Sequence, residues 1–186
     1  MKDVSRNYVI FDVETTGLYP RRGDRIIEIG AVSIRDGIVN GEFYSMVRVE
    51  RKITKGARQV HGITDDMLVD GPLPEIVYPR FQAFIRESVL IAHNARFDIA
   101  FLRAEFHRLG LGLANRHICT LEMSRRRYPG LGDYTLSTVY RHIFGSVPEG
   151  TQVHRALDDA RMAARIWMEM TRDCSENSIE CWSKVS

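Results

Sequence analysis

The sequence has few cysteines and no long hydrophobic run. Cys119, Cys174 and Cys181 form neither a C-x-x-C pair nor an even-numbered set, which argues against a disulfide framework and predicts a reducing compartment. No stretch approaches the roughly 18 apolar residues of a membrane-spanning helix, and the opening MKDVSRNYVIF lacks the apolar core of a signal peptide. The sequence therefore predicts a soluble, cytoplasmic protein with no membrane partner.

An excess of charge of either sign is also missing. Lys and Arg number 26 against 24 Asp and Glu, which gives a formal net charge of +2. No overall field then draws the protein to nucleic acid, so any anion site must be local. A chain of 186 residues fits one domain. We expect this domain at residues 1–172, followed by a tail at 173–186 that loses periodicity and is either flexible or a docking segment.

Apolar runs predict an antiparallel meander at the start of the chain. Residues 7–12 and 25–34 have the pattern of buried strands. The dipeptide at 36–37, Asp-Gly, is a hairpin turn signal, so residues 38–49 can pair back as a third strand.

The rest of the chain alternates strand and helix signals. Residues 89–93 form a short strand, and a helix over 97–109 follows, a crossover that favours parallel pairing. Another helix begins at Pro74, although Pro79 could kink or delay it. Further helices are expected over 135–144, capped by Thr135, and over 156–172. Together these elements predict an α/β fold with a mixed central sheet flanked by helices.

Two carboxylates lie at the end of the first predicted strand and a third begins a helix. Side chains at i and i+2 of a strand share a face, so Asp12 and Glu14 can act side by side. Alone, such a pair is more often a solvated strand end. Asp98 lies at the start of the helix over 97–109, where an acid is commonly only a cap or a partner of the helix dipole.

His154 and Asp159 provide a more specific signal near the last predicted helix. Five helical residues rotate by about 140° net, so His154 must precede the helix if the two side chains are to meet. Asp158 shares a charged stripe with Arg161, which predicts ordinary ion pairs and a nearly silent replacement by Ala. Asp159 lies on the apolar face, where a carboxylate needs a proton, a cation or an Arg partner.

Converging carboxylates favour hard divalent ions. No Cys or His cluster has zinc-like spacing, so Mg²⁺ or Mn²⁺ is expected. Two such ions, about 3.5 to 4 Å apart, can activate water and stabilise the leaving oxygen of a phosphoryl displacement. His154 can accept the proton of that water at neutral pH, which assigns it the general-base role.

Four motifs in this order resemble the DEDDh 3′-5′ exonucleases, especially the ε-like proofreading exonucleases of bacterial DNA polymerase III. They are VIFDVETTGL, QVHGIT, AHNARFDIAFL and VHRALDDA. The resemblance implies an RNase H-like fold for the 1–172 exonuclease domain, and release of nucleoside 5′-monophosphates from 3′ ends. Carried over by motif position, the metal ligands would be Asp12, Glu14, Asp98 and Asp159, and the base would be His154.

The same resemblance implies residues that contact the terminal nucleotide: Thr15, Gly17, Leu18, Val60, His61, Asn94 and Phe97. Phe97 could stack on a base or simply cover the start of its helix. Without the resemblance, His61 would be assigned a structural role. The run Arg125–Arg127 could follow a phosphate backbone, but a solvated helix end is the favoured interpretation.

Substrate and partner stay open at this stage. Single-stranded DNA is favoured, with an RNA-trimming exoribonuclease of the same family as the alternative. The chain ends at Ser186 without a Q-L-x-L-F-like clamp motif, so a DNA polymerase partner, a stand-alone repair enzyme and an excised domain all remain candidates. A non-catalytic nucleic-acid- or polymerase-binding module is the alternative from another class.

Overall fold

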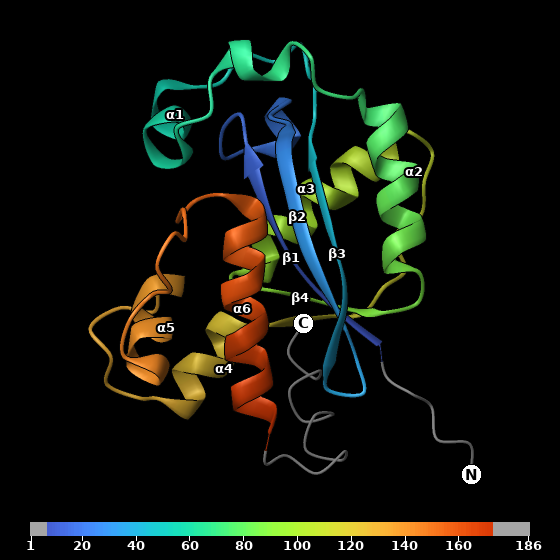
Figure 1. The fold of residues 1–186 in the computed structure, drawn as a ribbon. Helices are drawn as coiled ribbons and strands as arrows, with labels where there is room; N and C mark the ends of the chain where they lie inside the picture. The colour runs from blue at the N-terminus through green and yellow to red at the C-terminus, as the bar shows by residue number, and fades with distance from the viewer. Residues whose placement is uncertain (1–6, 173–186) are drawn as a thin grey trace, which may run out of the picture.

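A five-stranded sheet runs through the molecule and carries helices on both faces (Figure 1). The computed structural model describes residues 7–172, so the expected tail at 173–186 lies outside the described residues. The strands are β1 (Asn7–Thr15), β2 (Ile26–Arg35), β3 (Ile38–Met46), β4 (Val89–Ala92) and β5 (His117–Cys119).

The sheet is mixed, with strand order β3-β2-β1-β4-β5. β1, β2 and β3 form the antiparallel meander, while β4 pairs parallel to β1 and β5 parallel to β4. The predicted hairpin turn is present: Asp36 and Gly37 both have left-handed backbones, with φ of 52° and 76°. Asp-Gly suits such two-residue turns because both residues tolerate positive φ. The predicted mixed sheet is confirmed.

Four helices lie where periodicity predicts them, and two others have no such signal. α2 begins at Pro74 without delay and continues through Pro79. The Thr135 hydroxyl caps α5 by accepting the Thr138 N–H. No helix within residues 7–172 is long and apolar enough to cross a membrane. The helices are α1 (Lys55–His61), α2 (Pro74–Ile85), α3 (Ala95–Arg108), α4 (Thr120–Arg127), α5 (Leu136–Phe144) and α6 (Ala156–Thr171), with short 3-10 turns η1 (Pro20–Arg22) and η2 (Asp65–Leu68).

The sheet separates two apolar cores. On one face α2 and α3 pack against Val9, Phe11 and Val13 of β1. On the other face α4, α5 and α6 pack against Tyr8 and Ile10. Side chains alternate between the faces of a strand. The series that begins with Tyr8 and Ile10 therefore continues with two acids on the α6 side of the sheet.

β1 is longer than the strand predicted at 7–12. It continues to Thr15 because its backbone stays paired with β2, with Glu14 opposite Glu28. The register then shifts between Glu14 and Thr15, which marks a bulge. Hydrophobic periodicity ends where the acids begin, whereas the backbone ladder does not, so the sequence pattern placed the end of the strand too early.

Candidate active site

Asp12 and Glu14 lie on the same face of β1, beneath the first turn of α6. Asp12 is half-buried and pairs across the sheet with Gly30, while Glu14 is buried and pairs with Glu28. The strand thus places both carboxylates on one surface, as the i, i+2 spacing predicts.

Gly30 allows α6 to approach this surface closely. A Cβ at Gly30 would lie 2.2 Å from the backbone nitrogen of Leu157 and 2.4 Å from the carbonyl carbon of Ala156. No side chain fits at those distances. The absence of a side chain at Gly30 therefore brings the N-terminus of α6 against the sheet directly beside Asp12.

Asp98 lies close to Asp12 but comes from α3. It lies in the first turn of α3 and is buried. Its carboxylate accepts the backbone N–H of Val13, the residue between the two acids of β1, and also its own N–H. These bonds fix the Asp98 side chain against β1, a more specific role than capping α3.

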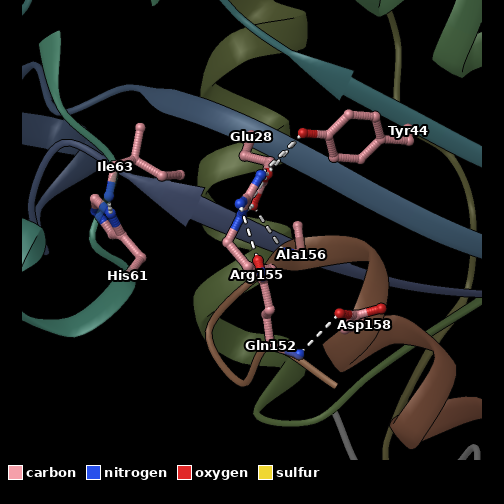
Figure 2. Close-up of polar contacts among 8 residues, drawn as sticks. All are labelled: Glu28, Tyr44, His61, Ile63, Gln152, Arg155, Ala156 and Asp158. Atoms are coloured by element: carbon pink, nitrogen blue, oxygen red, sulfur yellow. Dashed lines mark hydrogen bonds and ion pairs between the residues drawn. The ribbon is translucent and has the colours of Figure 1, made fainter. Parts of the chain in front are cut away.

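The adjacent aspartates of α6 have different surroundings. Asp159 is buried, and its Oδ2 accepts the His154 N–H at 3.2 Å. Its Oδ1 is buried with no hydrogen-bond partner among residues 7–172. Asp158 is paired with Arg161 at 3.1 Å, as its charged stripe predicts, but it also accepts the Gln152 N–H at 3.0 Å (Figure 2). Asp158 therefore holds the loop before α6 in addition to forming an ion pair.

His154 precedes α6, which begins at Ala156, so the predicted order is observed. Its side chain is exposed and its backbone is left-handed, with φ of 65°, a conformation that is unusual for a non-glycine residue. One potential ligand atom each from Glu14, His154 and Asp159 lies within 4.8 Å of the other two. This triad differs from the expected ligand set, since it includes the expected base and leaves Asp12 and Asp98 beside it.

The carboxylates repel one another strongly. Burial and then the charge of Asp98 raise the pKa of Asp12 well above its usual range. Burial, followed by repulsion from Asp159, raises the pKa of Glu14 to about 9. Burial is also the main cause that raises the pKa of Asp98 to about 8 and that of Asp159 to about 6. Without a cation, the cluster retains protons at neutral pH.

This donor set fits hard divalent cations. Carboxylate oxygens are the ligands that Mg²⁺ and Mn²⁺ prefer, and bound cations would relieve the mutual repulsion. The Oδ1 of Asp159 is the clearest sign, because a buried polar atom normally has a partner and this one has none within the described part of the chain, residues 7–172. The residues present therefore suit the metal chemistry that their sequence pattern predicts.

A buried ion pair beside the site was not among the functional residues that the sequence predicted. Glu28 of β2 is fully buried and accepts from the guanidinium of Arg155, the residue after His154, at 2.6 Å (Figure 2). A charged residue inside the apolar run RIIEIGAV was the available signal, since a buried acid in a central strand needs a partner.

The loop after β1 contains three of the predicted substrate contacts. The Thr15 hydroxyl donates to the Gly17 carbonyl at 2.7 Å. A Cβ at Gly17 would lie 2.5 Å from Oδ2 of Asp24, so only glycine fits that turn unless Asp24 moves. Leu18 follows with 66% of its surface exposed. An apolar side chain is thus held out into solvent next to the acids.

His61 has both ring nitrogens engaged within the protein. Nδ1 accepts the Ile63 N–H at 3.0 Å (Figure 2). The proton is therefore on Nε2, which donates to the Thr15 carbonyl at 3.2 Å. Burial lowers the pKa of His61, which suits this neutral form. The ring connects the end of α1 to the end of β1, and neighbouring Val60 is 56% exposed.

Asn94 and Phe97 flank the start of α3. Asn94 is exposed with a left-handed backbone, φ 83°. Phe97 is half-buried, with its ring centroid 4.9 Å from that of Phe101. One part of the Phe97 ring therefore belongs to the core, and the remainder is accessible to a ligand.

The arginine run ends α4. Arg125, Arg126 and Arg127 are all exposed, and Arg125 lies over the ring of Tyr134 at 5.8 Å from its centroid. This arrangement is that of a solvated helix end, the interpretation that the sequence favoured.

Comparison with known proteins identifies the family. The sequence model of the RNase T exonuclease family matches residues 9–167. The chain belongs to the DEDDh exonuclease family. The described core of this exonuclease domain, from β1 to α6, thus lies almost wholly within the matched region.

Relatives of this exonuclease domain include DNA polymerase III proteins of bacteria. The DNA polymerase III subunit epsilon of Rickettsia felis is 39% identical over 170 residues, covering 88% of this chain and 73% of that protein. The DNA polymerase III PolC-type of Caldanaerobacter subterraneus is 36% identical over 179 residues. That match covers 96% of this chain but 12% of the relative, so the chain spans about an eighth of such proteins.

Solved exonuclease structures share the fold. Exonuclease X in complex with 5′-overhanging duplex DNA superposes with a TM-score of 0.72 at 30% identity, covering 90% of this chain and 92% of that one. The nuclease domain of 3′hExo, a DEDDh family member bound to rAMP, has a TM-score of 0.76 at 19% identity, covering 95% and 96%. The predicted RNase H-like exonuclease fold is confirmed.

Proposed function

We propose that this chain hydrolyses the terminal phosphodiester bond at the 3′ end of single-stranded DNA and releases nucleoside 5′-monophosphates. One observation carries the proposal: an exposed histidine lies against a cluster of buried, mutually repelling carboxylates, and one carboxylate oxygen of that cluster has no partner among residues 7–172. A fold has no structural use for such a cluster, because each charge costs stability unless a cation offsets it.

The carboxylates would hold two divalent cations, Mg²⁺ or Mn²⁺. Glu14 and Asp159 offer oxygens within 4.8 Å of each other, and Asp12 and Asp98 adjoin them. The Val13 N–H keeps Asp98 turned towards β1. When bound, the cations would supply Lewis-acid activation of water and stabilise charge on the phosphate.

His154 would act as general base. Its ring is exposed, so water and a phosphate can both reach it. Its backbone N–H is bonded to Asp159, which ties the base to the cation-binding carboxylates. A neutral imidazole that water can reach is a suitable acceptor for a proton from that water.

The terminal nucleotide would lie among the exposed apolar side chains around the acids. Leu18, Val60 and the accessible part of Phe97 offer surfaces for a base or sugar. Thr15, Gly17 and His61 would shape the loop that carries Leu18, since their hydrogen bonds and close packing define its turn. Asn94 would add a polar contact from the start of α3.

DNA is the favoured substrate because the structure of exonuclease X, at 30% identity, contains DNA. RNA trimming is the alternative, and discrimination would depend on contacts with the 2′-hydroxyl. The DNA polymerase III relatives also support a DNA polymerase as partner, with residues 1–172 acting as the exonuclease domain.

The test uses purified protein, a 5′-labelled single-stranded DNA oligonucleotide and Mg²⁺ or Mn²⁺. We expect a ladder of products shortened from the 3′ end, with nucleoside 5′-monophosphates released. Asp12→Asn should give no ladder and serves as the control for contamination. An RNA oligonucleotide of the same sequence, supplied in competition, measures the preference. If the protein degrades neither polymer with either metal, the proposal is wrong.

A non-catalytic binding module is the competing function. It would bind oligonucleotides without needing cations in the carboxylate cluster. Calorimetric titration with Mn²⁺ separates the two, because a nuclease should bind the ion in a manner that Asp159→Ala weakens. A binding module should give the same weak titration for the parent protein and the variant.

A further inference from the structure

Glu28 is a fully buried carboxylate in the middle of the sheet, and the segment around His154 satisfies it. Its Oε1 accepts from Nη2 of Arg155 at 2.6 Å and from Nε at 2.9 Å, and its Oε2 accepts the Ala156 N–H at 2.9 Å. The Tyr44 hydroxyl donates to Oε1 at 2.9 Å (Figure 2). The two residues that follow His154 are therefore bonded to one side chain of β2.

This connection matters because the backbone at His154 is unusual. A non-glycine residue at φ of 65° persists only when its surroundings hold it. On its C-terminal side, Arg155 and Ala156 are fixed to Glu28. On its N-terminal side, the Gln152 N–H donates to Asp158.

We infer that Glu28 and Arg155 are positioning residues that set the place of the His154 ring over the carboxylates. The inference rests on the proposed function, because it takes His154 as the base. Arg155 forms a planar, two-point contact, which fixes direction as well as distance. Tyr44 completes the arrangement, since its hydroxyl also accepts from Nη2 of Arg155 at 3.1 Å.

A second buried pair in the same protein provides a matched control. Arg25 donates from Nε and Nη2 to the two carboxylate oxygens of Glu105, at 2.7 and 2.8 Å. The side-chain exposures are similar, 22% for Arg25 and 28% for Arg155, against 1% and 0% for their acids. The Arg25 pair joins α3 to the start of β2 and includes no residue of the His154 loop. Loss of either pair should lower stability, whereas only loss of Arg155 should move His154.

The first experiment compares Arg155→Met, Arg155→Lys and Arg25→Met in the full chain, with labelled single-stranded DNA and Mn²⁺. We expect Arg155→Met to lower kcat by about 10- to 100-fold, as a displacement near 1 Å can, with KM within about twofold. The Arg25→Met protein should have a lower melting temperature than the parent but a kcat within about threefold of the parental value. Equal losses of kcat in the two Met variants would overturn the inference.

Arg155→Lys keeps the test informative if Arg155→Met fails to fold. Lysine still neutralises Glu28 but cannot make the two-point contact. We expect a melting temperature close to that of the parent and a kcat between those of the parent and the Met variant. A parental kcat in Arg155→Lys would show that only the charge is needed, and would contradict positioning.

A double-mutant cycle with His154→Ala links Arg155 to the base itself. If Arg155 acts through His154, Arg155→Met should lower kcat by less than about twofold once His154 is replaced. Multiplicative losses would overturn the inference, because they would mean that Arg155 acts independently of His154. A nuclease whose activity survives His154→Ala would instead refute the proposed base, so the two failures are distinguishable.

Hydrogen exchange provides a readout that needs neither metal nor substrate. The His154 and Ala156 amides are bonded to Asp159 and Glu28. In the metal-free protein, Arg155→Met should speed exchange of both amides more than Arg25→Met does. Unchanged exchange at both amides in Arg155→Met would contradict the inference.

Discussion

Replacing Gly30 by alanine should disable the site by moving α6. The added Cβ would lie 2.2 Å from the Leu157 nitrogen, 1.2 Å short of the 3.4 Å at which ordinary contact begins. The obstructing atoms are backbone, so no side-chain rotation can relieve the clash. The first turn of α6 would have to withdraw from β2 by about this distance, and it would carry Asp159 and the preceding His154 with it.

Two magnitudes follow from that displacement. Overpacking of this kind costs about 1–3 kcal/mol of stability. For a domain of this size the melting temperature should fall by about 2–4 °C per kcal/mol. Misplacement of reacting groups by about 1 Å should lower kcat by roughly 100-fold.

Thermal melting and single-stranded DNA hydrolysis measure both effects in the same preparation. Gly112→Ala is the matched control, because no heavy atom of the described residues lies within 4 Å of its added Cβ. We expect the control to behave as the parent. A Gly30→Ala protein with parental kcat would refute the claim that the closeness of α6 to β2 sets the geometry of the site.

Three further outcomes follow from the charges around the site. Glu14→Gln should abolish activity yet raise the unfolding free energy of the metal-free protein at neutral pH by about 1–3 kcal/mol, because Gln is neutral in both states whereas Glu14 must take up a proton when the chain folds; a lower melting temperature in EDTA would contradict this. The folded protein holds protons on Glu14 and Asp98 up to a pKa of about 9 and 8, whereas the unfolded chain releases them near pH 4. The unfolding free energy of the metal-free protein should therefore be highest in acid and fall as pH rises towards 9. Mn²⁺ should raise the melting temperature more at pH 8 than at pH 6. A melting temperature of the metal-free protein that increases with pH over this range would contradict the reasoning. Asp159→Ala should eliminate hydrolysis, while Asp158→Ala should lower kcat by about 3- to 10-fold, because Asp158 holds the Gln152 N–H; equal losses would remove the distinction between the two aspartates.

Periodicity predicted the elements with a continuous apolar face. The meander, the Thr135 cap and α6 are each predicted by residues that lie close together in the sequence within that one element. α4 lacks such a face, since Thr120 and five more of its eight residues are polar or charged. β5 has only three residues. Short elements of this kind depend on tertiary contacts, which a local pattern does not contain.

The candidate site was predictable in part for the same reason. The separation of Asp158 from Asp159 follows from helix geometry: the structure buries Asp159 and pairs Asp158 with Arg161, as expected. The further contact of Asp158 with the Gln152 N–H was not expected. The contacts of Glu28 with Arg155 join residues 127 positions apart, and the space at Gly30 depends on where α6 docks. Both features arise only when the sheet and α6 meet, although the acid within RIIEIGAV was a visible sign that a partner was required.

A crystal of the protein grown with Mn²⁺ tests most directly whether the buried carboxylates hold divalent cations. Anomalous scattering from Mn²⁺ locates the ions without reference to activity. We expect anomalous density beside Glu14 and beside Oδ1 of Asp159, the buried oxygen that has no partner among residues 7–172. Anomalous peaks confined to surface acids, with none at Asp159 or Glu14, would contradict the account.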